Sequence, residues 1–195
     1  MRIKVYLSDE GYGHIVRQEA IIKELFRLRN DLDITIQTKE KINVVKEKLG
    51  DSVTYIEKFN NINTTKKITG FLDLEETKKC FENYYNIFDK VVEDESKNFD
   101  FDMIISDTVP EAHEIARLNH VPSFGIFHFD WGWFCSKVYP ELTDVIDLFS
   151  KCYKSATKIY MPPFSPPEIT EKYSKNLINV PCIINDFNNV DIPKT

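Results

Sequence analysis

The first 28 residues constrain the fold more than any other stretch, because their periodicity changes across a glycine turn. Ile3, Val5 and Leu7 alternate with polar residues, which predicts a short strand that ends before Gly11. Apolar residues then recur at three- and four-residue spacings, which predicts a helix over 15–28. A strand, a glycine turn and a helix begin a βαβ unit, in which ligands bind beyond the carboxyl ends of the strands.

The same alternation of strand and helix continues along most of the chain. Further strands are predicted at 33–38, 52–56, 101–106, 122–129 and 158–160, and further helices at 39–49, 73–97, 111–119 and 134–155. Residues 59–70 are rich in Asn, Thr and Lys and are predicted to form a loop. This order predicts an α/β fold: a Rossmann-like, doubly wound parallel sheet of six or seven strands, with helices on both faces and the first strand in its interior.

The last 35 residues depart from this pattern. Four prolines between residues 162 and 167 cannot continue the interior of a sheet, 178–184 is only weakly strand-like, and 185–195 has few apolar residues. We therefore expect a Rossmann-like domain over 1–160. Residues 161–195 are expected to be a proline-rich connector and tail that leads to a further domain.

The net charge of −6 argues against general binding to nucleic acid. No apolar stretch approaches the roughly 20 residues of a membrane-spanning helix, and the amino terminus lacks the apolar region of a signal peptide. The four cysteines form no CxxC pair, so we expect free thiols in a reducing cytoplasm and no metal. Peripheral contact with a membrane and self-association both stay open.

The turn Gly11-Tyr12-Gly13-His14 is the first candidate site. Glycines allow a ligand to approach the backbone closely, the start of a helix favours anionic groups, and a histidine can take up a proton near neutral pH. The alternative is a turn with a locally hydrogen-bonded histidine. Because the third glycine of the dinucleotide fingerprint is missing, no NAD or FAD is expected, and no other cofactor is predicted.

Asp107 is the second candidate, because it comes directly after a buried apolar run. A carboxylate at that place can orient a histidine from the neighbouring strand end and stabilise its protonated form. The alternative, which fits the sequence equally well, is that Asp107 caps the helix that begins near Pro110.

The third candidate is the aromatic segment 128–134. Its rings can stack on sugars or bases, and His128, Asp130 and Trp131 are predicted to contact substrate. The alternative is aromatic core packing beneath a loop. His113 lies within a predicted helix and His120 in a turn, so both are predicted to be structural.

These segments, taken in order, resemble the amino-terminal half of GT-B glycosyltransferases, which include the UDP-glycosyltransferases and the N-acetylglucosaminyl transferase of peptidoglycan synthesis. The resemblance is carried by the run from Gly11 to His14 with Arg17 and the helix 20–25, by Asp102 to Asp107, and by 111–125. Residues 128–131 are similar to an aromatic segment of sugar-kinase relatives. The resemblance covers roughly residues 1–160, and it rests on the order of the motifs.

The resemblance implies a domain that binds a hydroxyl acceptor, while a second Rossmann-like domain, absent from this sequence, binds the nucleotide-sugar donor. It implies that His14 is the general base and that Asp107 orients it. The isolated chain is then expected to be inactive and to bind nucleotide sugars weakly. Two alternatives remain: a nucleotide-sugar epimerase of the same architecture, and a non-catalytic sugar- or nucleotide-binding module.

Overall fold

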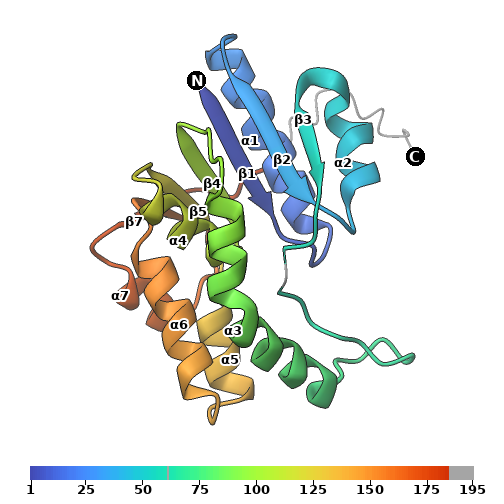
Figure 1. The fold of residues 1–195 in the computed structure, drawn as a ribbon, viewed down its shortest axis with the longest axis vertical. Helices are drawn as coiled ribbons and strands as arrows, with labels where there is room; N and C mark the ends of the chain where they lie inside the picture. The colour runs from blue at the N-terminus through green and yellow to red at the C-terminus, as the bar shows by residue number, and fades with distance from the viewer. Residues whose placement is uncertain (61, 185–195) are drawn as a thin grey trace, which may run out of the picture.

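A computed structural model describes residues 1–60 and 62–184, and in them a single sheet of seven parallel strands runs through the molecule (Figure 1). The strands are β1 (Arg2–Leu7), β2 (Asp33–Thr38), β3 (Thr54–Glu57), β4 (Met103–Asp107), β5 (Ser123–Ile126), β6 (Lys158–Met161) and β7 (Leu177–Asn179). Their order is β3-β2-β1-β4-β5-β6-β7. The prediction of a parallel sheet with an interior first strand is confirmed.

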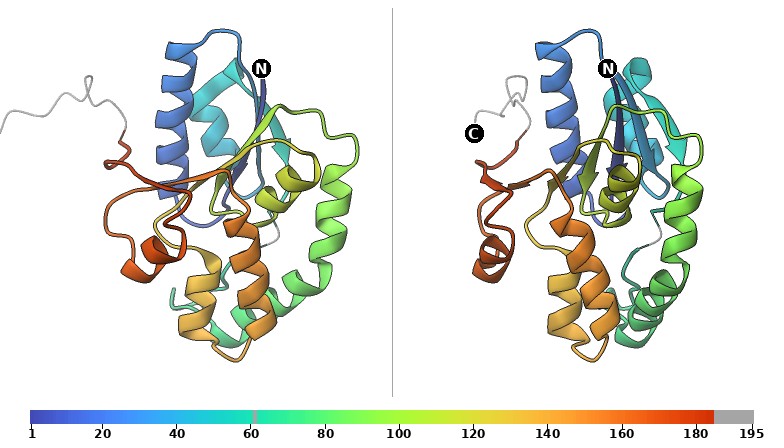
Figure 2. Two further views of the ribbon diagram at one scale, coloured as in Figure 1. Left: turned by 90° about the vertical axis from the view of Figure 1, so that its left-hand side faces the viewer. Right: turned by 60° about the vertical axis from the view of Figure 1, so that its left-hand side comes forward.

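Helices cover both faces of this sheet, as the two turned views show (Figure 2). They are α1 (Gly13–Leu28), α2 (Ile42–Leu49), α3 (Leu74–Ser96), α4 (Glu111–Leu118), α5 (Trp131–Val138), α6 (Thr143–Lys154) and α7 (Pro167–Lys172), with a 3-10 turn at Gly50–Ser52. One apolar cluster joins the strands to α1 and α2, and a second joins them to α3, α4 and α6. The chain is therefore doubly wound, as predicted.

The central strand β1 shows why its sequence alternates. Ile3 and Val5 are fully buried in the cluster beneath α1 and α2. Lys4 and Tyr6 point to the opposite face, where Lys4 Nζ lies 2.6 Å from Glu95 on α3 and the Tyr6 hydroxyl donates to the same carboxylate at 2.9 Å. Burial raises the pKa of Glu95, but Lys4 and the hydrogen bonds outweigh it and lower that pKa to about 2. The polar half of the alternation is thus satisfied inside the protein.

Beyond the carboxyl ends of the strands, α5, α6 and the first half of α3 form a helical extension (Figure 1). Its centre is the fully buried Phe81, whose ring packs edge to face against Trp131, Phe134, Tyr139 and Phe149 at centroid distances of 5.7–6.1 Å. The extension is therefore held by aromatic packing, and it gives the carboxyl edge of the sheet a second wall.

The prediction of one helix over 134–155 is wrong, because the chain forms two. Helix α5 ends at Val138 and α6 begins at Thr143, with Pro140 between them. Proline keeps the residue before it out of the helical region, and Tyr139 has φ −135° and ψ 62°. Strand β5 also ends at Ile126 rather than at residue 129, because the chain turns there to begin α5 at Trp131.

The sheet also continues past residue 160, where the connector was expected to begin. Helix α7 begins at Pro167, the last of the four prolines, and strand β7 follows it and pairs in parallel with β6. Ile169 and Tyr173 are buried in the main core. An edge strand needs partners on one side only, which the prolines before it do not prevent. The expectation for 185–195 lies outside the described residues.

Candidate functional site

Two neighbouring strands bring the first two candidate segments together. Strands β1 and β4 pair in parallel, with Leu7 opposite Asp107, so the loop after β1 lies over the end of β4. Gly11 takes φ +52°, a conformation that suits glycine, and the chain then enters α1 at Gly13. His14 is consequently placed in the first turn of α1, above the carboxyl end of β4.

The side chains of His14 and Asp107 are in direct contact. His14 Nδ1 lies 2.6 Å from Asp107 Oδ1, and the carboxylate is completely buried, whereas the imidazole is partly exposed. The expected approach of the two side chains to hydrogen-bond distance is confirmed. The alternative, in which Asp107 caps the next helix, is not observed: α4 begins after Pro110 without a side-chain cap.

Two further side chains of α1 bind the same carboxylate, and neither was assigned a role from the sequence. Arg17 Nε donates to Asp107 Oδ2 at 3.0 Å and its Nη2 donates to Oδ1, while Gln18 Nε2 donates to Oδ2 at 2.9 Å. Positions three and four residues after His14 lie on the same helical face, so the spacing was the signal that could have found them.

This arrangement determines the charge of Asp107. Burial alone would raise the pKa of the carboxyl, but the charge of Arg17 and the hydrogen bonds from His14 and Arg17 hold that pKa well below its usual range. Asp107 is therefore ionised at every physiological pH. It can orient the His14 ring and stabilise a positive charge there without itself taking a proton.

A cleft of about 570 Å³ opens beside this cluster. One wall is polar and consists of Glu10, Gly11, Gly13, His14, Arg17, Thr64 and Thr108; the other is mostly apolar and consists of His128, Phe129, Trp131, Phe134, Pro162 and residues 182–184. Thr64 is held to the polar wall because its hydroxyl donates to Glu10 Oε1 at 2.9 Å. Tyr12 is not part of the lining: its ring is exposed, with Lys41 Nζ 4.5 Å from its centroid.

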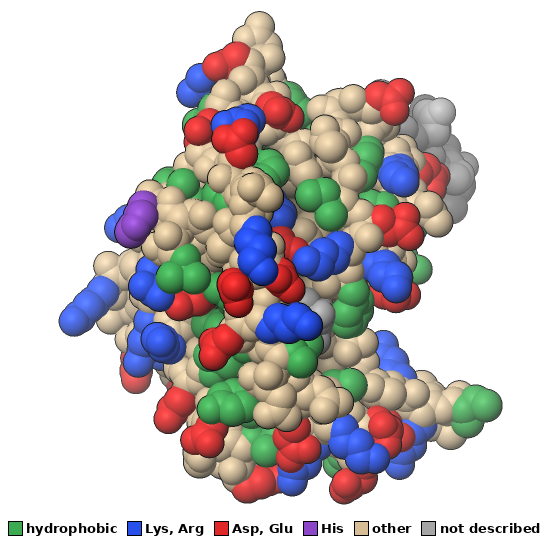
Figure 3. Space-filling view, in the orientation of Figure 1, with side chains coloured by type: hydrophobic (Ala, Val, Ile, Leu, Met, Phe, Trp, Pro, Cys, Tyr) green, Lys and Arg blue, Asp and Glu red, His purple; other side chains and the backbone are tan. Residues whose placement is uncertain are grey.

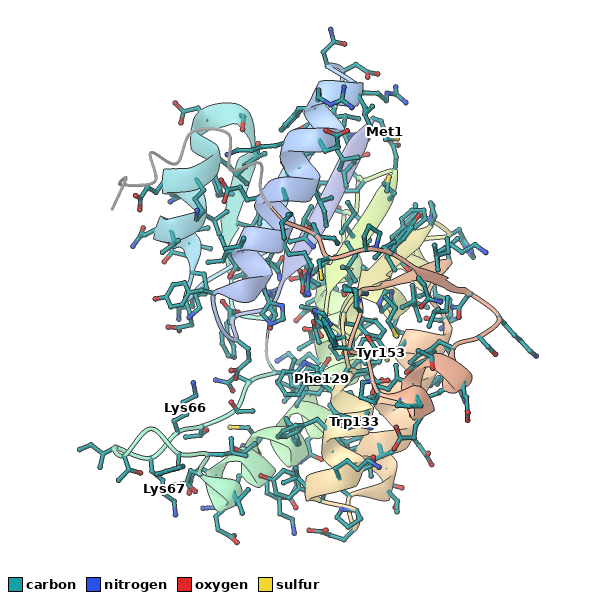
Figure 4. The ribbon with its side chains drawn as sticks, turned by 180° about the vertical axis from the view of Figure 1, so that it is seen from behind. Met1, Lys66, Lys67, Phe129, Trp133 and Tyr153 are labelled. Carbon is teal, nitrogen blue, oxygen red and sulfur yellow. The ribbon has the colours of Figure 1, made fainter. Side chains whose placement is uncertain are left out.

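The aromatic segment contributes to the cleft only in part. His128 lines it, and its Nδ1 lies 3.0 Å from the carbonyl oxygen of Pro163. Phe129 and Trp133 lie side by side, with ring centroids 5.7 Å apart (Figure 4). Trp131 reaches the lining but is only 5 % exposed, so packing in the aromatic core explains most of its surface.

Asp130 does not reach the cleft, contrary to its prediction as a substrate contact. It is fully buried and caps α5, accepting a hydrogen bond from the backbone nitrogen of Trp133 at 2.6 Å. Its other oxygen accepts from the Tyr173 hydroxyl at 2.6 Å and from Lys172 Nζ at 3.3 Å. A carboxylate directly before a helix commonly caps it by accepting hydrogen bonds from the first backbone nitrogens.

The remaining titratable candidates lie away from the cleft. His113 is fully buried, with Nδ1 3.0 Å from the Ser123 hydroxyl, and burial lowers its pKa to about 3, while His120 is exposed in a turn. The four cysteines are free. In residues 1–60 and 62–184, no group of three or more His, Cys, Asp or Glu is placed to hold a metal ion.

Known structures share this fold. A glycotransferase of kitacinnamycin matches 100 % of this chain and 55 % of its own, with 12 % identity and a TM-score of 0.62. UGT89C1 of Arabidopsis thaliana, solved with UDP-L-rhamnose, matches 97 % of this chain and 53 % of its own, with 14 % identity and a TM-score of 0.61. UGT2 of Phytolacca americana, solved with UDP-2fluoro-glucose and pterostilbene, matches 94 % of this chain and 55 % of its own, with 13 % identity and a TM-score of 0.54. No protein-family model and no curated protein sequence matches the chain.

These comparisons establish the fold: the chain is built like the amino-terminal half of the larger GT-B glycosyltransferases that it matches. It spans about half the length of the solved structures that it matches. At 12–14 % identity this likeness shows the architecture alone and does not show the activity. Within the described ranges, no helix is both long and apolar enough to cross a membrane.

Proposed function

We propose that this chain is the acceptor-binding half of a glycosyltransferase that moves a sugar from a nucleotide-sugar donor to a hydroxyl acceptor. One observation carries the proposal: a partly exposed histidine lies in a cleft with its Nδ1 against a fully buried, ionised aspartate. The fold shared with UDP-glycosyltransferases supports the donor class, because several of those structures contain UDP or a UDP-sugar.

The contacts of His14 define its part in the reaction. Nδ1 is engaged with Asp107, which leaves Nε2 as the nitrogen that accepts a proton from the acceptor hydroxyl. As that proton transfers, the acceptor oxygen forms a bond to the anomeric carbon of the donor, and the bond from this carbon to the diphosphate breaks. The electron pair of the broken bond leaves with the nucleotide diphosphate, and His14 keeps the proton until it passes to solvent.

Arg17 and Gln18 prepare Asp107 for this step. Together with His14 they fix both carboxylate oxygens, so the ring of His14 is held in one orientation before the acceptor binds. A positioned base contributes about 10²–10⁴ in rate. Stabilisation of the leaving diphosphate falls mainly to the donor-binding half, with the backbone amides of the Gly11–Gly13 turn adjacent to it.

The test is product analysis with the natural protein that carries this sequence. The protein is incubated with UDP-sugars and a panel of hydroxyl acceptors, and the products are separated and weighed by mass spectrometry. A transferase gives a glycosylated acceptor and free UDP. An isomerised nucleotide sugar formed without an acceptor identifies an epimerase instead. Binding of sugar without any turnover identifies a non-catalytic module, and either of these results contradicts the proposal.

A further inference from the structure

A short hairpin between β3 and α3 carries two of the three most exposed large apolar side chains of the described residues, the third being Phe164 between β6 and α7. Ile68 is fully exposed and Phe71 is 77 % exposed. The hairpin projects from the helical extension, away from the sheet (Figure 1), and the space-filling view shows a hydrophobic tip with basic and acidic side chains behind it (Figure 3).

The hairpin is held in one conformation by its own backbone. Lys66 and Leu72 form an antiparallel bridge, the nitrogen of Lys67 donates to the carbonyl of Phe71 at 2.8 Å, and Gly70 closes the turn with φ +83°. At its base, the nitrogen of Thr65 donates to the Thr77 hydroxyl on α3 at 3.0 Å. The apolar tip is therefore presented on a supported projection.

The tip itself carries only positive charges, and acidic residues begin just beyond it at the start of α3. Lys66 and Lys67 are exposed beside Ile68, and within the described residues neither forms an ion pair (Figure 4). Of the acidic residues that follow, Asp73 caps α3 through the nitrogen of Glu76, Glu76 pairs with Lys79, and Glu75 is exposed. The chain as a whole carries a net charge of −6, so the positive charge of Lys66 and Lys67 is opposite in sign to that of the whole chain.

We propose that this hairpin, residues 65–72, docks the protein on the surface of an anionic lipid bilayer. Ile68 and Phe71 enter the boundary between headgroups and acyl chains, while Lys66 and Lys67 contact anionic headgroups. Apolar burial combined with nearby lysines is the usual composition of a peripheral membrane contact. Each lysine near an anionic surface contributes about a fivefold gain in affinity.

Other occupants fit the tip less well. A stable protein interface buries about 800 Å² on each partner, which two apolar side chains at the end of a narrow projection cannot supply. Pairing of two copies through their tips would bring four lysines together, and like charges in contact oppose association. A bilayer needs no complementary shape and accepts a projecting tip.

The position of the hairpin gives the contact a consequence for the cleft. Thr64, which directly precedes the hairpin, lines the cleft and is bonded to Glu10 on its polar wall. A docked hairpin therefore holds the mouth of the cleft near the membrane surface. The contact itself is independent of the proposed transferase activity, because it involves none of the residues that bind Asp107.

The experiment is vesicle flotation of the 195-residue chain. Phosphatidylcholine vesicles are compared with vesicles that contain about 30 % phosphatidylglycerol, an anionic lipid, in low and high salt. The variants are I68S/F71S at the tip and K66E/K67E beside it. L28S, an exposed apolar residue on α1, and K90E, an exposed lysine in the second half of α3, serve as matched controls. Circular dichroism and gel filtration of each variant report folding and oligomeric state.

We expect the wild-type chain to float with anionic vesicles and much less with phosphatidylcholine, and high salt to weaken the binding. I68S/F71S and K66E/K67E should each lower the affinity at least tenfold, and the two controls should leave it within twofold. Three results would overturn the proposal: no flotation of the wild-type chain, flotation that the tip and lysine variants leave unchanged, or a dimer that I68S/F71S converts to a monomer in the absence of lipid.

Discussion

Asp107 ends strand β4 and Asp130 lies four residues after the neighbouring strand β5, and both are completely buried, yet they have different partners. Asp107 ends β4, and α4 begins only after Pro110, so its oxygens are free to receive His14, Arg17 and Gln18 from α1. Asp130 directly precedes α5, and the helix takes one of its oxygens. The distance along the chain from a carboxylate to the next helix thus decides whether that carboxylate can serve a cleft.

The largest effect that separates the two regions is catalytic. His14→Ala in the natural protein should lower kcat/KM by about 10²–10⁴, because the proposed proton acceptor is removed while the fold is kept. Turnover of a UDP-sugar with a hydroxyl acceptor is the measurement, and circular dichroism checks the fold. His120→Asn, at an exposed histidine far from the cleft, is the control and should leave the rate unchanged. A His14→Ala protein with wild-type turnover would remove this residue from the mechanism.

The next effect is on stability and concerns the cation beside Asp107. Arg17→Met leaves a buried carboxylate without its main charge partner, and such a loss costs about 3–5 kcal/mol of unfolding free energy. Arg27→Met, on the same helix, breaks an exposed ion pair with Glu24 that solvent screens, and should leave the unfolding free energy close to that of the wild type. Urea denaturation of the two variants measures the contrast. Equal losses would mean that the Asp107 cluster is not the buried ion pair described above.

Removal of Asp130 tests the structural side of the comparison. Asp130→Ala should cost about 2–4 kcal/mol of unfolding free energy, because α5 loses its cap and the buried Tyr173 hydroxyl loses its acceptor. Asp147→Ala, at an exposed position within α6, should stay within about 0.5 kcal/mol of the wild type. If Asp130→Ala is as stable as this control and instead impairs substrate binding, Asp130 belongs to the cleft after all.

Glu111 extends the comparison to a buried carboxylate that has no cation beside it. Burial raises its pKa to about 7 despite a 2.6 Å hydrogen bond from the Tyr84 hydroxyl. The folded state holds this proton more tightly than the unfolded state does. The contribution of Glu111 to the free energy of unfolding is therefore full below pH 4.5 and is lost as the pH rises through 7. His113 has the opposite effect: because its pKa is lowered in the folded state, its contribution to the free energy of unfolding is lost as the pH falls below 6.5.

The two contributions are separated by a difference measurement. The stability of Glu111→Gln relative to the wild type should rise by about 2 kcal/mol between about pH 5 and pH 7, because only the wild type carries the carboxyl. Glu114→Gln on the same helix is the control, since its bond to Arg117 lowers the pKa of Glu114 and the difference should stay flat in this range. A flat difference for Glu111→Gln would show that this carboxyl is not protonated in the folded protein.

Periodicity was sufficient to predict most of the fold. The strand–helix alternation predicted the parallel sheet, its interior first strand and the approach of His14 to Asp107, because parallel strands end at the same edge. It was insufficient where tertiary contacts decide. The burial of Ile169 and Tyr173 brings α7 and β7 into the fold after a proline run, and no local pattern reports that contact.

The site was predicted less completely, for two physical reasons. Arg17 was visible at helical spacing from His14, but an arginine on an amphipathic helix usually faces solvent, and only the buried Asp107 draws it inward. Asp130 and Trp131 have residue types that suit sugar binding. In the structure, however, Asp130 caps α5 and Trp131 packs against Phe81 in the aromatic core. Residue type therefore suggested the candidate residues, and their burial in the folded chain determines which of them reach the cleft.

We propose that this chain carries the acceptor wall of the site, while most contacts to the donor lie elsewhere. Calorimetric titration of UDP-sugars into the 195-residue chain tests it directly, with His14→Ala as the matched variant. One half-site cannot offset the cost of immobilising a nucleotide sugar, so we expect a Kd weaker than about 10 μM. Binding tighter than that would place the donor site in this chain and would contradict the account.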